Sequence, residues 1–226
     1  MSNQLPRVAV VRYTRRMIIT YHGAGCVKLV AGETTLAFAP VSKDSTLKAV
    51  SFGADVAFVP LNHPDTNGVG QVARGSKEPF IIRGPGEYEV AGVTAAGYPS
   101  ASRYGKEKRI NTIYVLNFDS MTVLYLGALA EEKLPSEISE DLESIDVLFV
   151  PIGGGGVLEP NEAQKLVVAL EPRIVVPIFW GDVGEKDALK TFLKEYGAEG
   201  VQRVDKLTIK AKDMAALEGE VVVISS

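Results

Sequence analysis

Short apolar runs separated by turn residues occupy the first half of the chain. Runs of about four to eight apolar residues bounded by Gly, Pro, Asn or Asp are typical of β-strands. Gly84-Pro85-Gly86 and Asp119-Ser120 are strong turn signals, as are Gly32-Glu33 and Ala91-Gly92. The pattern therefore predicts strands over 17–21, 27–30, 35–38, 55–60, 80–83, 87–90, 92–97, 111–118 and 121–126.

The later part of the chain alternates strand and helix patterns. A strand over 146–151 leads into a helix from about Pro160 to Leu170, and a strand over 173–178 leads into a helix over 185–196 that ends at Gly197. Apolar runs at 207–210 and 220–224 flank a short helix at 212–217. Meanders followed by β-α-β units predict an α/β (α+β) architecture in which helices cover sheets.

Composition fits one globular domain. Of the 226 residues, 46% are hydrophobic and the mean hydropathy is +0.11, which is enough for a large core. We expect a basic extension over 1–16 and a single domain over 17–226. The extension has no secretory signal pattern, and the apolar runs are shorter than the roughly 20 residues that cross a membrane. We therefore expect no membrane association.

Charge and cysteine content limit the partners and the cellular location that we expect. The net charge of −4 argues against a general nucleic-acid surface, so nucleic acid is an unlikely partner. The one cysteine, Cys26, excludes an internal disulfide and predicts a reducing, cytoplasmic location. Cys26 is a candidate nucleophile, although packing is the simpler role because no base is placed beside it.

The chemistry is limited by two histidines, His22 and His63. His63-Pro64-Asp65 follows a predicted strand, where many metallohydrolases carry a His-x-His-x-Asp-His metal motif. Leu61 and Thr66 stand at two histidine positions of that motif. His63 and Asp65 could form an acid–base pair, but a hydrogen bond within the loop is favoured because no matching nucleophile is evident.

Several segments together resemble one family. They are Met17 to Cys26, the loop around His63, Gly84 to Val90, Asn111-Thr112-Ile113-Tyr114, Leu126-Gly127 and Val176-Pro177. In this order they resemble the metallo-β-lactamase superfamily, specifically the small metal-dependent hydrolases related to ascorbate-phosphate lactonases. The resemblance covers about residues 17 to 200 and implies a four-layer αββα sandwich.

The resemblance fails at the family's active site. Gly23-Ala24-Gly25-Cys26 replaces Gly-His-Ser-Cys, and Ala39-Pro40 replaces Asp-Pro. The histidines that the family expects fall at Leu61, Thr66, Ser102 and near Phe179, and its bridging aspartate falls at Ala128. Only His63 and Asp65 remain, one for each metal in the family layout. A catalytic zinc takes about three protein ligands. We therefore expect no metal, no cofactor and no hydrolysis by the family mechanism, with His63 and Asp65 as vestigial catalytic candidates.

The replacements remove carboxylates and add apolar bulk. This predicts a remodelled pocket that holds a small ligand and is lined by Ala24, Leu61, Ala128, Phe179 and Trp180. Plain core packing of Trp180 is equally compatible with the sequence. The partner is then an unknown small ligand, a protein, or a second copy of the chain.

Other features stay open as alternatives. Gly153 to Gly156 lie between a strand and a helix, as in a phosphate cradle, but lack the Gly-Lys-Ser/Thr that would complete the motif. Glu87 and Glu89 share one strand face. The basic stretch 103–109 is expected on an exposed loop and could contact nucleic acid.

The sequence thus predicts a degenerate metallo-β-lactamase-fold protein that has lost the metal site and acts in ligand binding or protein interaction. One alternative is a divergent metal-dependent hydrolase that keeps its metal through His63, Asp65 and further oxygen ligands. A second is a nucleic-acid-binding protein that uses 103–109.

Overall fold

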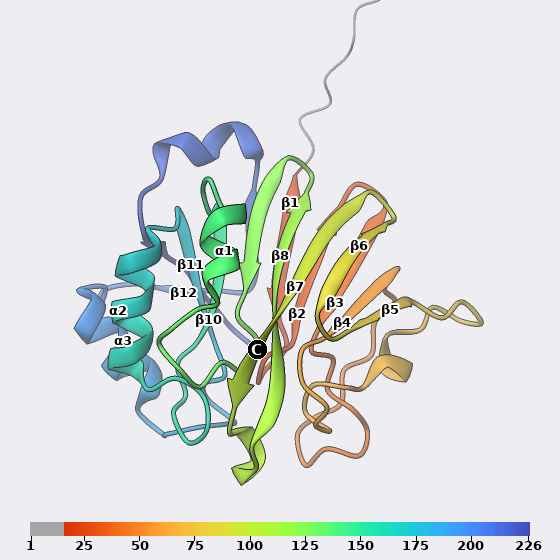
Figure 1. Cartoon of the computed structure of the whole chain (residues 1–226), viewed down its shortest axis with the longest axis horizontal. Helices are drawn as coiled ribbons and strands as arrows, with labels where there is room; N and C mark the ends of the chain where they lie inside the picture. The colour runs from red at the N-terminus through yellow and green to blue at the C-terminus, as the bar shows by residue number, and fades with distance from the viewer. Residues whose placement is uncertain (1–15) are drawn as a thin grey trace, which may run out of the picture.

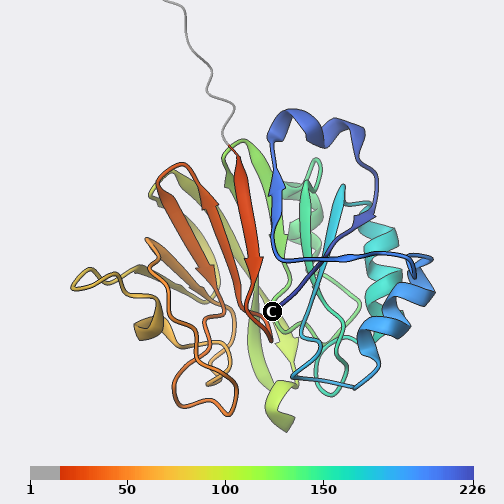
Figure 2. The same cartoon turned by 180° about the vertical axis from the view of Figure 1, so that it is seen from behind.

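Two β-sheets pack face to face in the computed structural model, which describes residues 16–226, the side chains of 139–141 excepted (Figures 1 and 2). The expected basic extension lies outside the described residues, apart from Arg16. The apolar side chains between the sheets form one continuous core.

The first sheet has six strands in the order β13-β1-β2-β3-β4-β5. β1, β2 and β3 form an antiparallel meander, whereas β3, β4 and β5 run parallel. Its strands are β1 (Met17–Tyr21), β2 (Val27–Ala31), β3 (Thr34–Phe38), β4 (Val56–Val59), β5 (Phe80–Arg83) and β13 (Leu207–Ile209).

The second sheet has seven strands in the order β14-β11-β10-β9-β8-β7-β6. β6 to β9 form an antiparallel meander, and β9, β10, β11 and β14 run parallel. Its strands are β6 (Gly86–Val90), β7 (Val93–Ser102), β8 (Arg109–Phe118), β9 (Met121–Tyr125), β10 (Val147–Pro151), β11 (Ile174–Ile178) and β14 (Glu220–Val221). A separate pair joins β12 (Arg203–Val204) to β15 (Val223–Ile224).

Three α-helices lie on the outer side of the seven-stranded sheet: α1 (Ser136–Asp141), α2 (Pro160–Leu170) and α3 (Ala188–Tyr196) (Figure 1). The 3₁₀ turns are η1 (Val69–Val72), η2 (Tyr104–Lys106) and η3 (Ala211–Ala216). α2 buries Ala163, Leu166 and Val167 along one face, as an amphipathic helix over a sheet does.

The other outer face, on the six-stranded sheet, is covered differently. Ala37 of β3 and Ala57 of β4 alternate with core-facing neighbours and pack with Val41, Val50 and Val72 in a second small cluster. Val41 and Val50 come from the loop between β3 and β4, and Val72 comes from η1. The expected sandwich is confirmed, with loop and 3₁₀ turn in place of α-helix on this face of the described chain.

Aromatic rings hold the two sheets together. Phe38 stacks on Phe58 at 4.6 Å between ring centroids and meets Tyr125 of the opposite sheet at 4.7 Å. The Tyr125 hydroxyl donates to the Gly25 carbonyl at 2.7 Å, and the Tyr114 hydroxyl donates to the Val59 carbonyl at 3.1 Å. Buried tyrosines therefore combine apolar contact with a satisfied hydroxyl in the core.

Most predicted elements are present close to their expected bounds. The predicted turns are correct, and Gly84 to Gly86 connects β5 of one sheet to β6 of the other. The strand expected over 92–97 extends to Ser102, and the helix expected over 212–217 is the 3₁₀ turn η3. α1 and β12 were not predicted. Within residues 16–226, no helix has the length and apolar character needed to cross a membrane.

Candidate functional site

The candidate site lies at one end of the sandwich, where several strands of both sheets end. β3, β4, β9, β10 and β11 all run toward this end, because β3 is parallel to β4 and β9 to β11 are parallel to one another. A backbone bond from Thr112 to the Pro60 carbonyl, 2.8 Å long, ties the two sheets together there. The loops after β4, β7 and β11 therefore meet in space.

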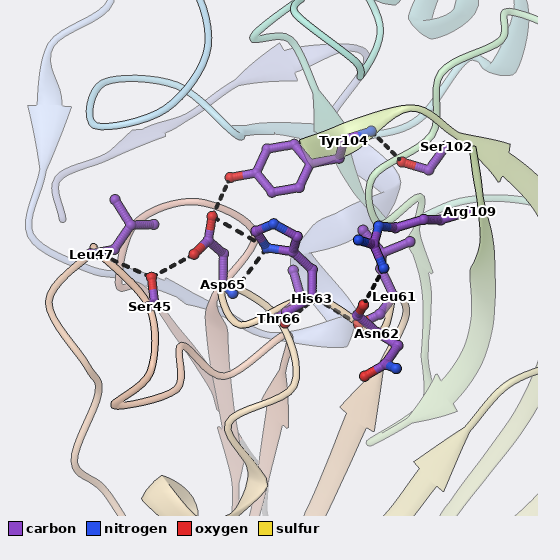
Figure 3. Close-up of polar contacts among 10 residues, drawn as sticks. All are labelled: Ser45, Leu47, Leu61, Asn62, His63, Asp65, Thr66, Ser102, Tyr104 and Arg109. Carbon is purple, nitrogen blue, oxygen red and sulfur yellow. Dashed lines mark hydrogen bonds and ion pairs between the residues drawn. The ribbon is translucent and has the colours of Figure 1, made fainter. Parts of the chain in front are cut away.

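Asp65 is the centre of this region (Figure 3). Its side chain is buried and accepts two short hydrogen bonds, from the Tyr104 hydroxyl to Oδ2 at 2.6 Å and from the Ser45 hydroxyl to Oδ1 at 2.5 Å. Buried carboxylates need such donors, because an unpaired charge away from water is unfavourable. Both carboxylate oxygens of Asp65 are thus already occupied by the protein itself.

His63 lies beside Asp65 in the same loop and contacts both its backbone and its side chain. The Asp65 backbone N–H donates to His63 Nδ1 at 3.2 Å, whereas Nδ1 lies 3.5 Å from Asp65 Oδ2. In the backbone contact the ring nitrogen Nδ1 is the acceptor. We assign the backbone contact as the hydrogen bond because it is shorter. The expected hydrogen bond within the loop is therefore present, with the backbone as donor.

The Tyr104 side chain contacts both His63 and Asp65. Its ring packs edge-on against His63 at 5.0 Å and against Phe179 at 5.1 Å between centroids. Burial and the hydrogen bond to Asp65 raise the pKa of the Tyr104 hydroxyl well above its ordinary value, so the hydroxyl stays protonated as a donor. Gly105 follows in the left-handed region with φ of 76°, and a Cβ there would lie 2.9 Å from His63 Nε2.

The expected exposed loop at 103–109 is therefore wrong at Tyr104, which points inward, whereas Arg103, Lys106 and Lys108 are exposed. Two hydrogen bonds hold the turn, from the Tyr104 N–H to the Ser102 hydroxyl and from the Arg103 N–H to the Gly156 carbonyl. Sequence analysis missed both Tyr104 and Ser45. The signal available for Tyr104 was a large aromatic residue directly before a glycine in an otherwise charged stretch.

Phe179 occupies the space between the sheets at the end of β11. It is fully buried, its N–H donates to the Ala24 carbonyl at 2.6 Å, and a Cβ on Gly25 would lie 2.6 Å from its ring. Gly25 therefore leaves the space that the Phe179 ring fills. Phe179 and Tyr104 together form what we call the aromatic plug, in which Tyr104 contacts His63 and Asp65 and Phe179 packs against Tyr104.

The other predicted pocket residues are packed rather than open. Leu61 and Ala128 are fully buried, and the Ala128 N–H donates to the Asn111 side-chain oxygen at 2.8 Å. Trp180 is 6% exposed and stacks on Tyr21 at 5.6 Å. Ala24 and Trp180 border two different surface pockets. A single ligand pocket lined by Ala24, Leu61, Ala128, Phe179 and Trp180 therefore stays a prediction.

The side chains in this region do not fit a catalytic zinc. No group of three or more His, Cys, Asp and Glu side chains that could hold a metal occurs within the described part of the chain. His63 Nδ1 and both Asp65 oxygens already have hydrogen-bond donors. A catalytic zinc takes about three protein ligands and an open position for water.

The Gly-rich segment 153–156 and the other sequence candidates lie in ordinary structural surroundings. Glu159 and Glu162 form a capping box at the start of α2, and a Cβ on Gly154 would lie 2.6 Å from a Glu159 carboxylate oxygen. These carboxylates occupy the place where a phosphate would bind, which argues against the phosphate cradle. Glu87 and Glu89 are exposed on β6, and His22 stacks on Phe52 at 4.9 Å.

Comparison with known proteins agrees with the fold. The family model described as a Beta-lactamase superfamily domain matches residues 18–179. The chain therefore belongs to the β-lactamase superfamily, and its fold is that of the metallo-β-lactamases.

A crystal structure from Thermotoga maritima, of a metallo-β-lactamase superfamily protein, is 26% identical and covers 92% of this chain and 98% of that one, with a TM-score of 0.70. A UPF0173 metal-dependent hydrolase of Natranaerobius thermophilus is 24% identical over 192 residues, 73% of this chain and 83% of that protein. The metallo-β-lactamase fold protein YhfI from Bacillus subtilis is 10% identical with a TM-score of 0.58, which shows the fold alone.

Replacing Tyr104 with Phe should destabilise the protein, because the largely buried Asp65 carboxylate loses one of its two hydroxyl donors. We expect a loss of about 1.5–3 kcal/mol in the free energy of unfolding, measured in urea at neutral pH. Tyr88→Phe is the matched control, since the half-buried Tyr88 hydroxyl donates to a backbone carbonyl at 3.1 Å. Its loss should stay below about 1 kcal/mol. Equal losses in the two variants would contradict the role assigned to Tyr104.

Cys26 should be unreactive in the folded protein. Its side chain has no exposed surface, and burial raises the pKa of the Cys26 thiol to about 12, so almost no thiolate exists at neutral pH. We expect negligible labelling by a thiol reagent in native buffer and complete labelling in guanidinium. Rapid labelling of the native protein would instead favour Cys26 as a nucleophile.

Proposed function

We propose that this protein is a metallo-β-lactamase-fold protein that has lost the metal site, performs no hydrolysis by the family mechanism, and acts by binding a ligand or a protein partner. The observation that carries this proposal is the hydrogen bonding of Asp65. Tyr104 and Ser45 donate to the two oxygens through which the carboxylate could bind a metal. The cytoplasmic location predicted from the single cysteine belongs to the same proposal.

The aromatic plug supports the proposal on steric grounds. Tyr104 packs edge to face on His63 and donates to Asp65, and Phe179 packs edge to face on Tyr104 and against Gly25. A hydrolytic water would need space beside His63 and Asp65. The Tyr104 ring occupies part of that space, and Phe179 supports it from behind with apolar contact in place of the polar cavity that metal catalysis requires.

The second candidate is a divergent metal-dependent hydrolase of the same superfamily. It is favoured by the relatives from Natranaerobius thermophilus and Thermococcus onnurineus, which are both named metal-dependent hydrolases. The Thermococcus protein is 34% identical over 98 residues, 42% of this chain and 44% of that protein. On this candidate, His63 and Asp65 would exchange their present hydrogen bonds for a metal.

Metal retention separates the two candidates. Tag-free protein incubated with zinc, manganese and iron and then desalted should hold far less than one ion per chain by inductively coupled plasma mass spectrometry. A chelator should leave the melting temperature unchanged, because an ion bound only to the folded state would stabilise it.

The two histidines provide matched variants for this experiment. Near-stoichiometric metal that His63→Ala removes and His22→Ala keeps would overturn the proposal and establish a metal site in the His63 loop. Metal that both variants keep would place a metal site elsewhere in the protein and would equally overturn a metal-free function.

A further inference from the structure

A pocket of about 480 Å³ lies between α3 and the segment that leads into β12. Its apolar lining includes Trp180, Leu189, Leu193 and Val201, and Arg203 stands at its edge. We call it the Trp180 pocket. Neither His63 nor Asp65 lines it, so it is distinct from the plugged site, and its volume lies within the range of about 300–1,000 Å³ typical of small-molecule sites.

Trp180 gives this pocket a fixed aromatic wall. The ring stacks on Tyr21 at 5.6 Å, and its indole N–H donates to the Pro177 carbonyl at 2.9 Å. Both contacts hold the ring in one orientation while the indole donor is satisfied. A ligand beside Trp180 would therefore not have to satisfy the indole N–H.

Arg203 lies over this wall and keeps its donors available. The Arg203 guanidinium carbon is 5.0 Å from the centroid of the Trp180 ring, a cation–π contact that orients the planar group. None of the ion pairs formed among residues 16–226 includes Arg203. A guanidinium held by its face presents its N–H edge, which suits the geometry of a carboxylate.

The charges around the Trp180 pocket add up to a slightly positive lining. Lys186 and Lys190 line it together with Arg203, whereas Asp187 and Glu199 supply the opposing charge. Three basic and two acidic side chains give a formal sum of +1. All five are exposed, so the pocket offers cationic donors beside an apolar wall.

We propose that the Trp180 pocket binds an amphipathic carboxylate, with the carboxylate on Arg203 and the apolar body against Leu189, Leu193 and Val201, next to Trp180. This inference rests on the binding role proposed above and names its ligand class. The apolar wall selects for a hydrocarbon or aromatic body, and Arg203 selects for the anionic group. The occupant is a small free acid.

The chain's one tryptophan allows a direct test, because its indole N–H gives a single resonance in a ¹H–¹⁵N correlation spectrum. Titration with octanoate should shift the Trp180 resonance saturably. Octylammonium has the same hydrocarbon chain with the opposite charge, and should bind about tenfold more weakly or not at all. The spectrum also reports whether each variant is folded.

Three exposed substitutions make the test specific. Arg203→Ala should weaken octanoate binding about tenfold, and Glu199→Gln should strengthen it about twofold by removing a repulsive charge. Arg83→Ala is the matched control, since Arg83 is exposed on β5 and does not line the pocket. The Arg83→Ala variant should bind octanoate with the affinity of the unmodified protein.

The inference is overturned if octanoate produces no saturable shift, if octylammonium binds equally well, or if Arg203→Ala and Arg83→Ala behave alike. These failures are distinguishable from failure of the proposed function. Retained metal that depends on His63 would refute the metal-free role and leave the octanoate result unchanged, whereas absent octanoate binding would leave the metal result unchanged.

Discussion

A buried carboxylate must be satisfied by donors, and the end of the sandwich that holds Asp65 is arranged around that requirement. Ser45 reaches Asp65 from the loop after β3, and Tyr104 reaches it from the turn between β7 and β8. These two hydrogen bonds join segments from both sheets. Because Tyr104 must lie inward to donate, its ring also meets Phe179, and the aromatic plug follows from the same constraint.

The sheets and the site are coupled through a few polar side chains of β8. Asn111 donates to the Leu126 carbonyl and accepts from the Ala128 N–H, which fixes the loop after β9. Tyr114 of the same strand donates across to β4. Both belong to the Asn-Thr-Ile-Tyr stretch on which the family resemblance partly rested. Its residues therefore have a structural role that does not require a metal.

Local signals in the sequence were sufficient for most of the fold and for only part of the site. Hairpins were predictable because residues such as Asp119 and Ser120 adopt the left-handed conformation that tight turns need. The His63–Asp65 contact was predictable because the two residues are neighbours in one loop. Tyr104 is 39 residues from Asp65, and its inward orientation depends on this distant hydrogen bond, which no local pattern encodes.

Ala24, Ala39 and Phe179 have φ values of 46°, 43° and 56°, a region that side chains of these types rarely adopt and that is unfavourable by about 1–2 kcal/mol per residue. All three stand where the family resemblance places active-site residues. The chain therefore holds an unfavourable backbone conformation at three positions where its side chains depart from the family pattern. The packing around these positions, such as the Phe179 N–H donating to the Ala24 carbonyl, must offset that cost.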